Sequence, residues 1–245
     1  MTGRTANYLI FVLCFTGGLA VSTGEAAAQI VPTGYTIPDI TLSPDHRYGV
    51  TVPDLDTPNP HNSLIEIKTG RVLAVIQADT GYEHANHISL LPSRWAKDNS
   101  FLLWEVDGKW SDTALVLLKL KNGEVEWQRN LLKIGEQAIL ARTKRAAPRK
   151  YRAAKEQNKG KYGSAYPDGF TVAVSAEGKE GEPRSLPSLP SLPLAIFVSL
   201  TSNPKGQEDP KFINLDAELE ASINSEGKFT VMKFRLGTKS PASRW

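Results

Sequence analysis

Apolar and polar residues alternate over many short stretches of this chain, which is the period of a strand with one buried face. The stretches with this alternation, or with a short apolar run between turn residues, are 48–52, 64–67, 72–76, 88–91, 101–106, 114–120, 125–131, 170–175, 194–200, 215–224 and 228–236. Turns between neighbouring stretches, which predict antiparallel hairpins, are Thr69-Gly70, Asp107-Gly108, Asn122-Gly123 and Ser225-Glu226-Gly227. The chain is therefore expected to be mainly β.

One region departs from the strand pattern. Residues 136–158 are rich in the strong helix formers Ala, Lys, Arg, Glu and Gln. Pro148 interrupts this region, so we expect two short helices with Pro148 in the first turn of the second. The apolar positions expected to face a sheet are Ile134, Ala138, Ile139 and Ala141 in the first helix and Tyr151, Ala154 and Ala147 in the second.

Part of the strand pattern occurs twice. Asp45 corresponds to Asp98 and Gly70 to Gly123, 53 residues further along, and the pairs Tyr48 with Phe101, Ile67 with Leu120 and Val72 with Val125 keep this offset without a gap. Each copy predicts an antiparallel meander of three or four strands. A repeat of this length indicates a repeated structural unit and says little about chemistry.

The sequence Ser43-Pro44-Asp45-x-Arg47 before an apolar strand, with a later strand ending in Thr69-Gly70, resembles a blade of the TolB-type β-propeller repeat. The resemblance covers about residues 40–131. His46 stands where that family commonly has glycine, and the second copy has Ala96-Lys97-Asp98 in place of Ser-Pro-Asp. Two blades cannot close a ring, because propellers take at least four. We therefore expect either two packed sheets or a sheet pair completed by the C-terminal strands.

These patterns together predict the fold class and the domains. The fold is expected to be mainly β with an α+β C-terminal part: two repeated, blade-like antiparallel meanders, then two short helices packed on a roughly four-stranded antiparallel sheet. The expected boundaries are 1–28 for a signal peptide, 29–132 for the repeats, 133–236 for the helices and sheet, and 237–245 for a tail. Residues 177–193, which repeat Leu-Pro-Ser, are expected to form a spacer.

The beginning of the chain has the pattern of an export signal. Arg4 precedes an apolar run over 8–15, and Ala26-Ala27-Ala28 places small residues before a cut at Gln29. The apolar stretch over 8–21 has 14 residues, fewer than the ~20 that a membrane-spanning helix needs, which argues against an uncleaved anchor. We expect a secreted or periplasmic protein.

Composition limits the chemistry that the exported chain can perform. The chain is 40% hydrophobic and 22% charged, as in ordinary globular proteins. Its only cysteine, Cys14, lies in the expected signal peptide, so the mature chain can form no disulfide, thiolate metal site or cysteine nucleophile. The sequence contains no phosphate-binding glycine loop and no dinucleotide fingerprint, so no cofactor is expected.

Asp79-Thr80-Gly81 follows an apolar strand, as the catalytic aspartate of aspartic peptidases does. Those enzymes need two aspartates that share a proton, and the chain has no second Asp-Thr-Gly or Asp-Ser-Gly. Tyr82 also stands where a small residue is usual. A turn at the end of a strand explains the same residues, so a hydrolase that uses Asp79 is the alternative interpretation.

Glu83, His84 and His87 are weak candidates for a metal site, because imidazoles and a carboxylate suit zinc. They lie in an expected loop, and their spacing matches no known zinc motif. No metal is therefore predicted.

Tryptophans gather in the second copy of the repeat, at Trp95, Trp104, Trp110 and Trp127. An exposed row of these rings could stack on sugars or bases, whereas buried rings would pack the sheet. We prefer the packing interpretation, because large aromatic side chains are mostly buried in folded proteins.

The most unusual surface is expected over 142–161, which has nine basic residues and one acidic residue in a chain of net charge +3. The side chains expected to be available to a partner are Arg142, Arg145, Arg149, Arg152, Lys155 and Lys159. A solvated helix face would explain them without any function. The functional explanation is contact with an anionic envelope polymer, a lipid surface or an acidic protein, and the small net charge argues against nucleic acid.

The sequence therefore predicts an exported binding or structural module of the cell envelope without catalytic activity. The alternative is a hydrolase, either of the aspartic type at Asp79 or metal-dependent at Glu83, His84 and His87.

Overall fold

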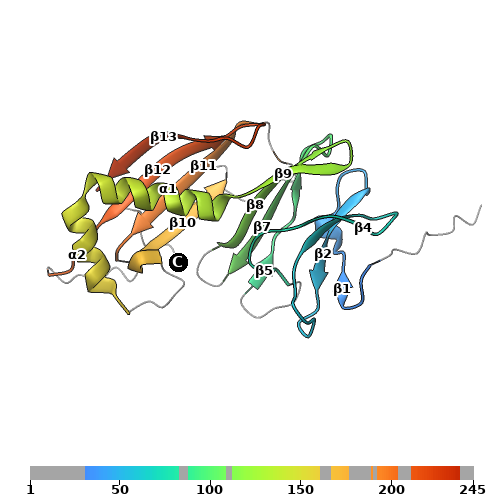
Figure 1. The fold of residues 1–245 in the computed structure, drawn as a ribbon, viewed down its shortest axis with the longest axis horizontal. Coiled ribbons are helices and arrows are strands. Elements are labelled where there is room, and N and C mark those ends of the chain that lie inside the picture. The colour runs from blue at the N-terminus through green and yellow to red at the C-terminus, as the bar shows by residue number, and fades with distance from the viewer. Residues whose placement is uncertain are drawn as a thin grey trace, which may run out of the picture.

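The computed structural model describes residues 31–82, 88–108, 112–160, 167–176, 189, 192–203 and 211–237. These residues form three antiparallel sheets and two α-helices, so the expectation of a mainly β fold is confirmed. The sheets follow one another along an elongated molecule, with the helices beside the last sheet (Figure 1). Within the described ranges, neither helix has the length and apolar character required to span a membrane.

The first sheet has the strand order β1-β2-β3-β4. Its elements are β1 (Tyr35–Thr36), η1 (Asp39–Thr41), β2 (Tyr48–Pro53), β3 (Ser63–Glu66) and β4 (Arg71–Val75). The expected tight turn at Thr69-Gly70 is a four-residue turn over 67–70, in which Gly70 has a φ of 67°. β2 is buried along its whole length, because the segment before it packs on one face and the second sheet on the other.

The second sheet has the order β5-β7-β8-β9, and β6 also pairs with β7. Its strands are β5 (Ile88–Leu90), β6 (Arg94–Trp95), β7 (Phe101–Gly108), β8 (Asp112–Lys121) and β9 (Glu124–Asn130). The turn at Asn122-Gly123 is confirmed, and both residues have positive φ, 53° and 78°, which these two residue types tolerate. The turn expected at Asp107-Gly108 is wrong, because β7 continues past a bulge and pairs with β8 as far as Asp107 with Asp112.

The two meanders contain the same tight turn before their first long strand. Asp45 and Asp98 each accept a hydrogen bond at Oδ1 from the backbone N–H two residues later, both at 3.0 Å. The residue that follows each aspartate, His46 or Asn99, has a positive φ of 57° or 60°. The aspartate side chain therefore closes a turn whose second position requires the left-handed region.

The end of β4 and the segment that follows it are held by side chains of β9. Gln128 accepts a hydrogen bond from the backbone N–H of Gln77 at 3.1 Å and donates one to the carbonyl of Val75 at 3.0 Å. Asn130 donates to the carbonyl of Gln77 at 3.0 Å. These amides therefore join the two meanders where β4 ends.

Contacts between the meanders join equivalent positions of the repeat. The pairs, each 53 residues apart, are Ile40 with Ser93, Arg71 with Glu124, Val75 with Gln128, and Gln77 with Asn130. As the residue number increases in the first meander, the number of its partner in the second meander increases by the same amount. The two meanders therefore lie side by side with their equivalent strands running in the same direction. A two-fold arrangement would instead pair residues whose numbers change in opposite directions.

The second sheet lies between the other two sheets and contributes to two hydrophobic cores. Leu102 and Trp104 of β7 are fully buried against the first sheet. Leu103 of β7, with Leu115 and Leu117 of β8, is buried against the C-terminal helices and sheet. The alternation of these strands therefore places apolar residues on both faces, since each face has a neighbour.

The helix α1 (Leu131–Ala146) begins directly where β9 ends, five residues before the expected start at residue 136. Asn130 caps it, because its side chain accepts a hydrogen bond from the N–H of Lys133 at 3.0 Å. The expected domain boundary after residue 132 thus falls in the first turn of α1.

The buried stripe of α1 has a four-residue spacing and consists of Leu131, Gly135, Ile139 and Thr143. A Cβ at Gly135 would lie 3.0 Å from Val174 and 3.1 Å from Val198, so a glycine lets the helix approach the sheet closely. Ile139 is buried as expected, but the expected burial of Ala141 is wrong. Ala141 is exposed, because Thr143 takes the sheet-facing position in that turn.

The second helix, α2 (Pro148–Asn158), has Pro148 at its first position, as expected. Tyr151 and Ala154 are buried, also as expected, and Gly160 follows the helix with a φ of 71°. Ala147 separates the two helices in a non-helical conformation, so α2 runs across the end of α1 (Figure 1).

The third sheet has the order β10-β11-β12-β13 and is fully antiparallel. After η2 (Pro167–Gly169), its strands are β10 (Thr171–Ala176), β11 (Leu194–Thr201), β12 (Asp216–Ile223) and β13 (Phe229–Leu236). The helices pack on one face of this sheet. Leu189, from the expected spacer, is buried and donates its backbone N–H to the carbonyl of Trp95 at 3.0 Å. At this residue the spacer is therefore packed on the second sheet.

Candidate anion-binding surface

The aspartate of the Asp79-Thr80-Gly81 tripeptide is exposed, whereas the other two residues serve the fold. Thr80 donates its hydroxyl to the carbonyl of Pro60 at 2.9 Å. Asn62 bonds both backbone groups of Gly81, accepting from its N–H at 2.7 Å and donating to its carbonyl at 2.9 Å. These hydrogen bonds anchor the loop, so the tripeptide is explained as the loop by which the chain leaves β4.

The weak metal candidates, Glu83, His84 and His87, lie outside the described residues. In the described part of the chain, no three His, Cys, Asp or Glu side chains come close enough together to hold a metal ion.

The three candidate tryptophans that the structure describes do not form an exposed row. Trp95 and Trp104 are buried in the core between the first two sheets, and Trp127 is half-buried, 5.9 Å from the ring of Phe101. Trp110 lies outside the described residues. In the described residues, these rings pack the sheets, as the sequence suggested.

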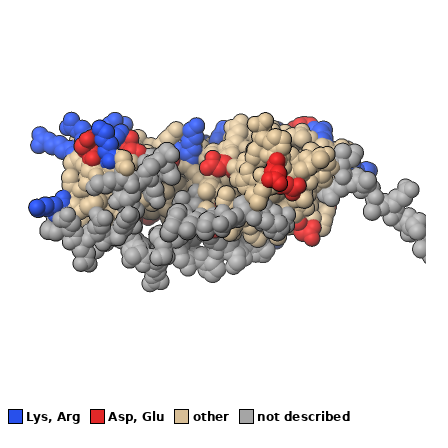
Figure 2. Space-filling view, turned by 90° about the horizontal axis from the view of Figure 1, so that it is seen from below, with Lys and Arg blue, Asp and Glu red and all other residues tan. Residues whose placement is uncertain are grey.

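Basic side chains surround the junction of α1 and α2, and we call this group the basic corner. Its members are Arg142, Lys144, Arg145, Arg149, Lys150 and Arg152. All six are exposed, and none has an ion-pair partner within 4 Å among the described residues. The basic corner lies at the end of the elongated molecule that α2 forms, where lysine and arginine gather in the space-filling view (Figures 1 and 2).

Local electrostatics in α2 oppose the charges of the basic corner. The N-terminus of a helix carries a partial positive charge, so acidic residues in the first turn are stabilising and basic residues are not. The first turn of α2 contains Arg149 and Lys150 and no acidic residue, and no side chain caps it. Helix stability alone would therefore not place these residues there.

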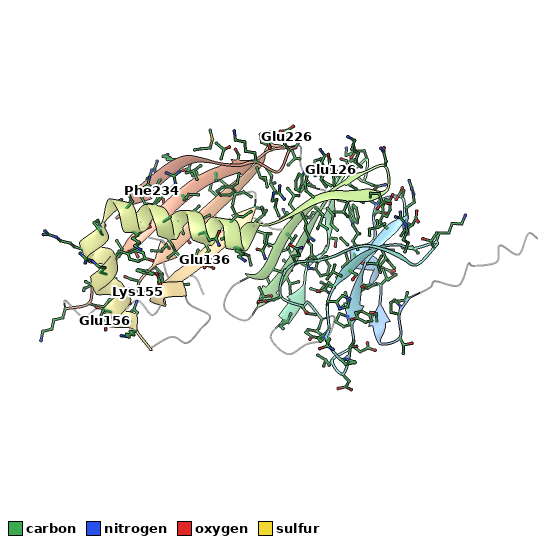
Figure 3. The ribbon with its side chains drawn as sticks, in the orientation of Figure 1. Glu126, Glu136, Lys155, Glu156, Glu226 and Phe234 are labelled. Carbon is green, nitrogen blue, oxygen red and sulfur yellow. The ribbon has the colours of Figure 1, made fainter. Side chains whose placement is uncertain are left out.

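Two of the six sequence candidates are neutralised by neighbours. Lys155 pairs with Asp168 of η2, and Lys159, which directly follows α2, lies 3.5 Å from Glu156 of that helix. Figure 3 shows Lys155 and Glu156 on α2, at the end of the molecule. The free positive charge is therefore concentrated nearer the junction of the two helices than the sequence indicated.

Sequence reasoning did not select Lys144 and Lys150. Both lie within the basic run, on the sides of the helices opposite to the candidates that were chosen. Lys144 and Lys150 are the direct neighbours of the buried residues Thr143 and Tyr151. On a helix, the neighbour of a buried residue points to the side of the helix, where solvent can reach a long side chain. This position is the signal that would have identified both lysines. Lys144 is also close enough to Asp168 to lower its pKa.

Asp168 fixes α2 to η2 through two side chains. It accepts a hydrogen bond from the hydroxyl of Tyr151 at 2.8 Å and pairs with Lys155. The hydrogen bond from Lys155 lowers the pKa of Asp168 most, burial opposes this effect, and the Tyr151 hydroxyl adds to the lowering. Burial and the neighbouring carboxylate raise the pKa of Tyr151, so this phenol stays protonated and acts as a donor.

We expect the contribution of Asp168 to stability to depend on pH. Because its pKa is lower in the folded state, its contribution is present above its ordinary pKa of 3.8 and is lost as the pH falls through the folded-state pKa. Urea denaturation should show wild type more stable than Asp168→Asn near neutral pH. The difference should shrink in acid. A difference that stays constant down to low pH would contradict this role for Asp168.

Comparisons of the chain with protein families, with curated proteins and with solved structures find no match. The functional argument therefore rests on the surface itself.

Proposed function

We propose that this chain is an exported, non-catalytic binding module of the cell envelope that contacts an anionic partner through its basic corner. The observation that carries the proposal is the group of six exposed basic side chains, with no ion-pair partner in the described residues, at one end of the fold. Export rests on the sequence of residues 1–28, which lie outside the described residues.

The cost of the basic corner to the free protein supports this proposal. Like charges within ~10 Å repel one another with only partial screening at physiological salt. Arg149 and Lys150 also oppose the dipole of α2, whereas Lys144 and Arg145 lie in the last turn of α1, which the dipole of that helix favours. An anionic partner would relieve the repulsion among these side chains, and its binding would weaken as salt rises.

We also propose that the two meanders are blade-like units of the kind found in TolB-type propellers. Their contacts support this, because equivalent residues meet in register, as they do in adjacent blades. The C-terminal helices and sheet cover the face of the second sheet that a third blade would cover. The segment before β2 covers the outer face of the first sheet. Such caps would let two blades be stable without a closed ring.

Retention on a heparin column tests the basic corner. We expect the wild-type protein to be retained at low salt, and replacement of Arg142, Arg145, Arg149 and Arg152 by glutamine to abolish retention. Lys155 is left in place, because its pair with Asp168 belongs to the fold. Circular dichroism should show that the variant is folded, since the four side chains are exposed.

A control variant removes the same number of charges elsewhere. Its exposed positions are Lys68, Lys97, Lys121 and Lys228, all replaced by glutamine. This control should remain on the column almost as well as wild type. If the two variants lose retention equally, net charge rather than the basic corner governs binding, and the proposed function fails.

A further inference from the structure

Charge is separated along the long axis of the molecule. The described residues 31–82, which form the first sheet and its loops, have six acidic and three basic side chains, a net charge of −3. This sheet lies at the opposite end of the molecule from α2 and the basic corner (Figure 1). A body with such ends takes a defined orientation near a charged surface, because one end is attracted and the other is repelled.

The basic corner is spread around a convex end. In α1, Arg142 and Lys144 flank the buried Thr143 on opposite sides, and Arg145 lies on the outer side. In α2, Lys150 and Arg152 flank the buried Tyr151 in the same way. A single polymer strand would reach only one side of such an end. A flat surface that touches this end of the molecule can be contacted by the long, flexible side chains on all sides of the end.

We propose, on the basis of the function proposed above, that the anionic partner is a bilayer containing anionic phospholipid. The protein meets the bilayer end-on through the basic corner, and its acidic first sheet is held away from the surface. Four of the six side chains of the corner are arginines, whose planar guanidinium groups bind phosphate oxygens in pairs.

Binding should be peripheral, without insertion into the hydrocarbon. The exposed large apolar side chains of the described residues are Ile40, Leu55, Val72, Val75, Met232 and Leu236. None of them lies in α1 or α2. Peripheral helices that insert carry apolar residues beside their basic ones, so the attraction here is electrostatic and reversible by salt.

Co-sedimentation with vesicles tests the partner. We expect the protein to bind vesicles that contain phosphatidylglycerol, not vesicles of phosphatidylcholine alone, and to be released by about 0.5 M salt. Each basic residue near such a surface changes affinity by about fivefold, so the four-arginine variant should bind at least about a hundredfold more weakly. The four-lysine control variant should bind almost as well as wild type. The four-arginine variant keeps the N-terminus of wild type, so its loss of binding would exclude binding by the leader.

Single cysteines test the orientation, because the protein after export is expected to contain no thiol. Glu156→Cys places a fluorescent label on α2, and Asp56→Cys places one on the exposed loop after β2. A quencher attached to lipid head groups should quench the label at 156 and leave the label at 56 bright. Equal quenching at both positions, or stronger quenching at 56, would overturn the end-on arrangement.

The heparin and vesicle results separate this inference from the proposed function. Retention on heparin without binding to vesicles would overturn the bilayer as partner and favour an anionic polymer, while the proposed function stands. Failure to bind either would overturn both. Vesicle binding that the four-arginine variant keeps would show that the basic corner is not the lipid contact.

Discussion

Replacing Arg94 by methionine should lower the free energy of unfolding by about 3 to 5 kcal/mol. Arg94 of β6 and Glu105 of β7 form an ion pair at 3.1 Å, and each side chain is only 7% exposed. The same guanidinium lies 3.5 Å from the carbonyl of Ala176 in β10, so the pair sits where the second sheet meets the C-terminal sheet. Without Arg94, Glu105 would lose this charge-assisted hydrogen bond at a position that is almost fully buried.

Replacing both members of the pair separates this cost from the value of the pair. A buried pair gains attraction but loses hydration, so apolar residues of similar size often substitute for it with little loss. We expect Arg94→Met with Glu105→Leu to be markedly more stable than Arg94→Met alone in urea denaturation. If the double variant loses as much free energy of unfolding as the two single variants together, the pair contributes more than mutual neutralisation, and this explanation is wrong.

Most of the strands and the turn at Asn122-Gly123 could be predicted because their signals are local. Asn122 and Gly123 are the two residue types that most readily take the positive φ of a two-residue turn, and the residues beside them alternate in polarity. The repeated aspartate turn is equally local, since each carboxylate bonds the backbone two residues away. Short-range chemistry of this kind is fully contained in the sequence.

The start of α1 and the buried ion pair could not be predicted, because no strong local pattern in the sequence marks either of them. Leu131 continues the apolar pattern of the strand before it, and only the cap formed by Asn130 marks the change to helix. Glu105 stands among the apolar residues of β7, but its partner is 11 positions earlier on a different strand. Pairing across strands depends on register and on neighbouring sheets, which a single sequence does not specify.

The positive charge of the candidate site could be predicted from the sequence, but the ion pairs that its side chains form could not. The run over 142–161 is visible in the sequence, and so is the break at Pro148. The neutralisation of Lys155 is not visible, because Asp168 reaches it only when η2 folds back on α2. The basic corner is what remains after such pairs are removed.

Replacing Gly81 by valine should destabilise the protein by about 3 kcal/mol or more, at the upper end of the range for overpacking a core. A Cβ at this position would lie 2.6 Å from Cγ2 of Val106 and 3.4 Å from the ring of Trp104, two residues that are fully buried. Asn62 bonds both backbone groups of Gly81, so the loop cannot withdraw without losing these hydrogen bonds. Thermal denaturation should show the loss as a large drop in melting temperature.

Asp79→Asn is the matched control, two residues away in the same tripeptide. Its side chain is exposed, and an exposed substitution of this kind usually changes stability by less than about 0.5 kcal/mol. The pair of variants therefore distinguishes a structural tripeptide from a catalytic one. A structural tripeptide requires Gly81 for folding and tolerates the loss of the aspartate. If instead Gly81→Val is stable, or a hydrolase activity found in wild type disappears in the folded Asp79→Asn variant, the structural explanation of Asp79-Thr80-Gly81 is wrong.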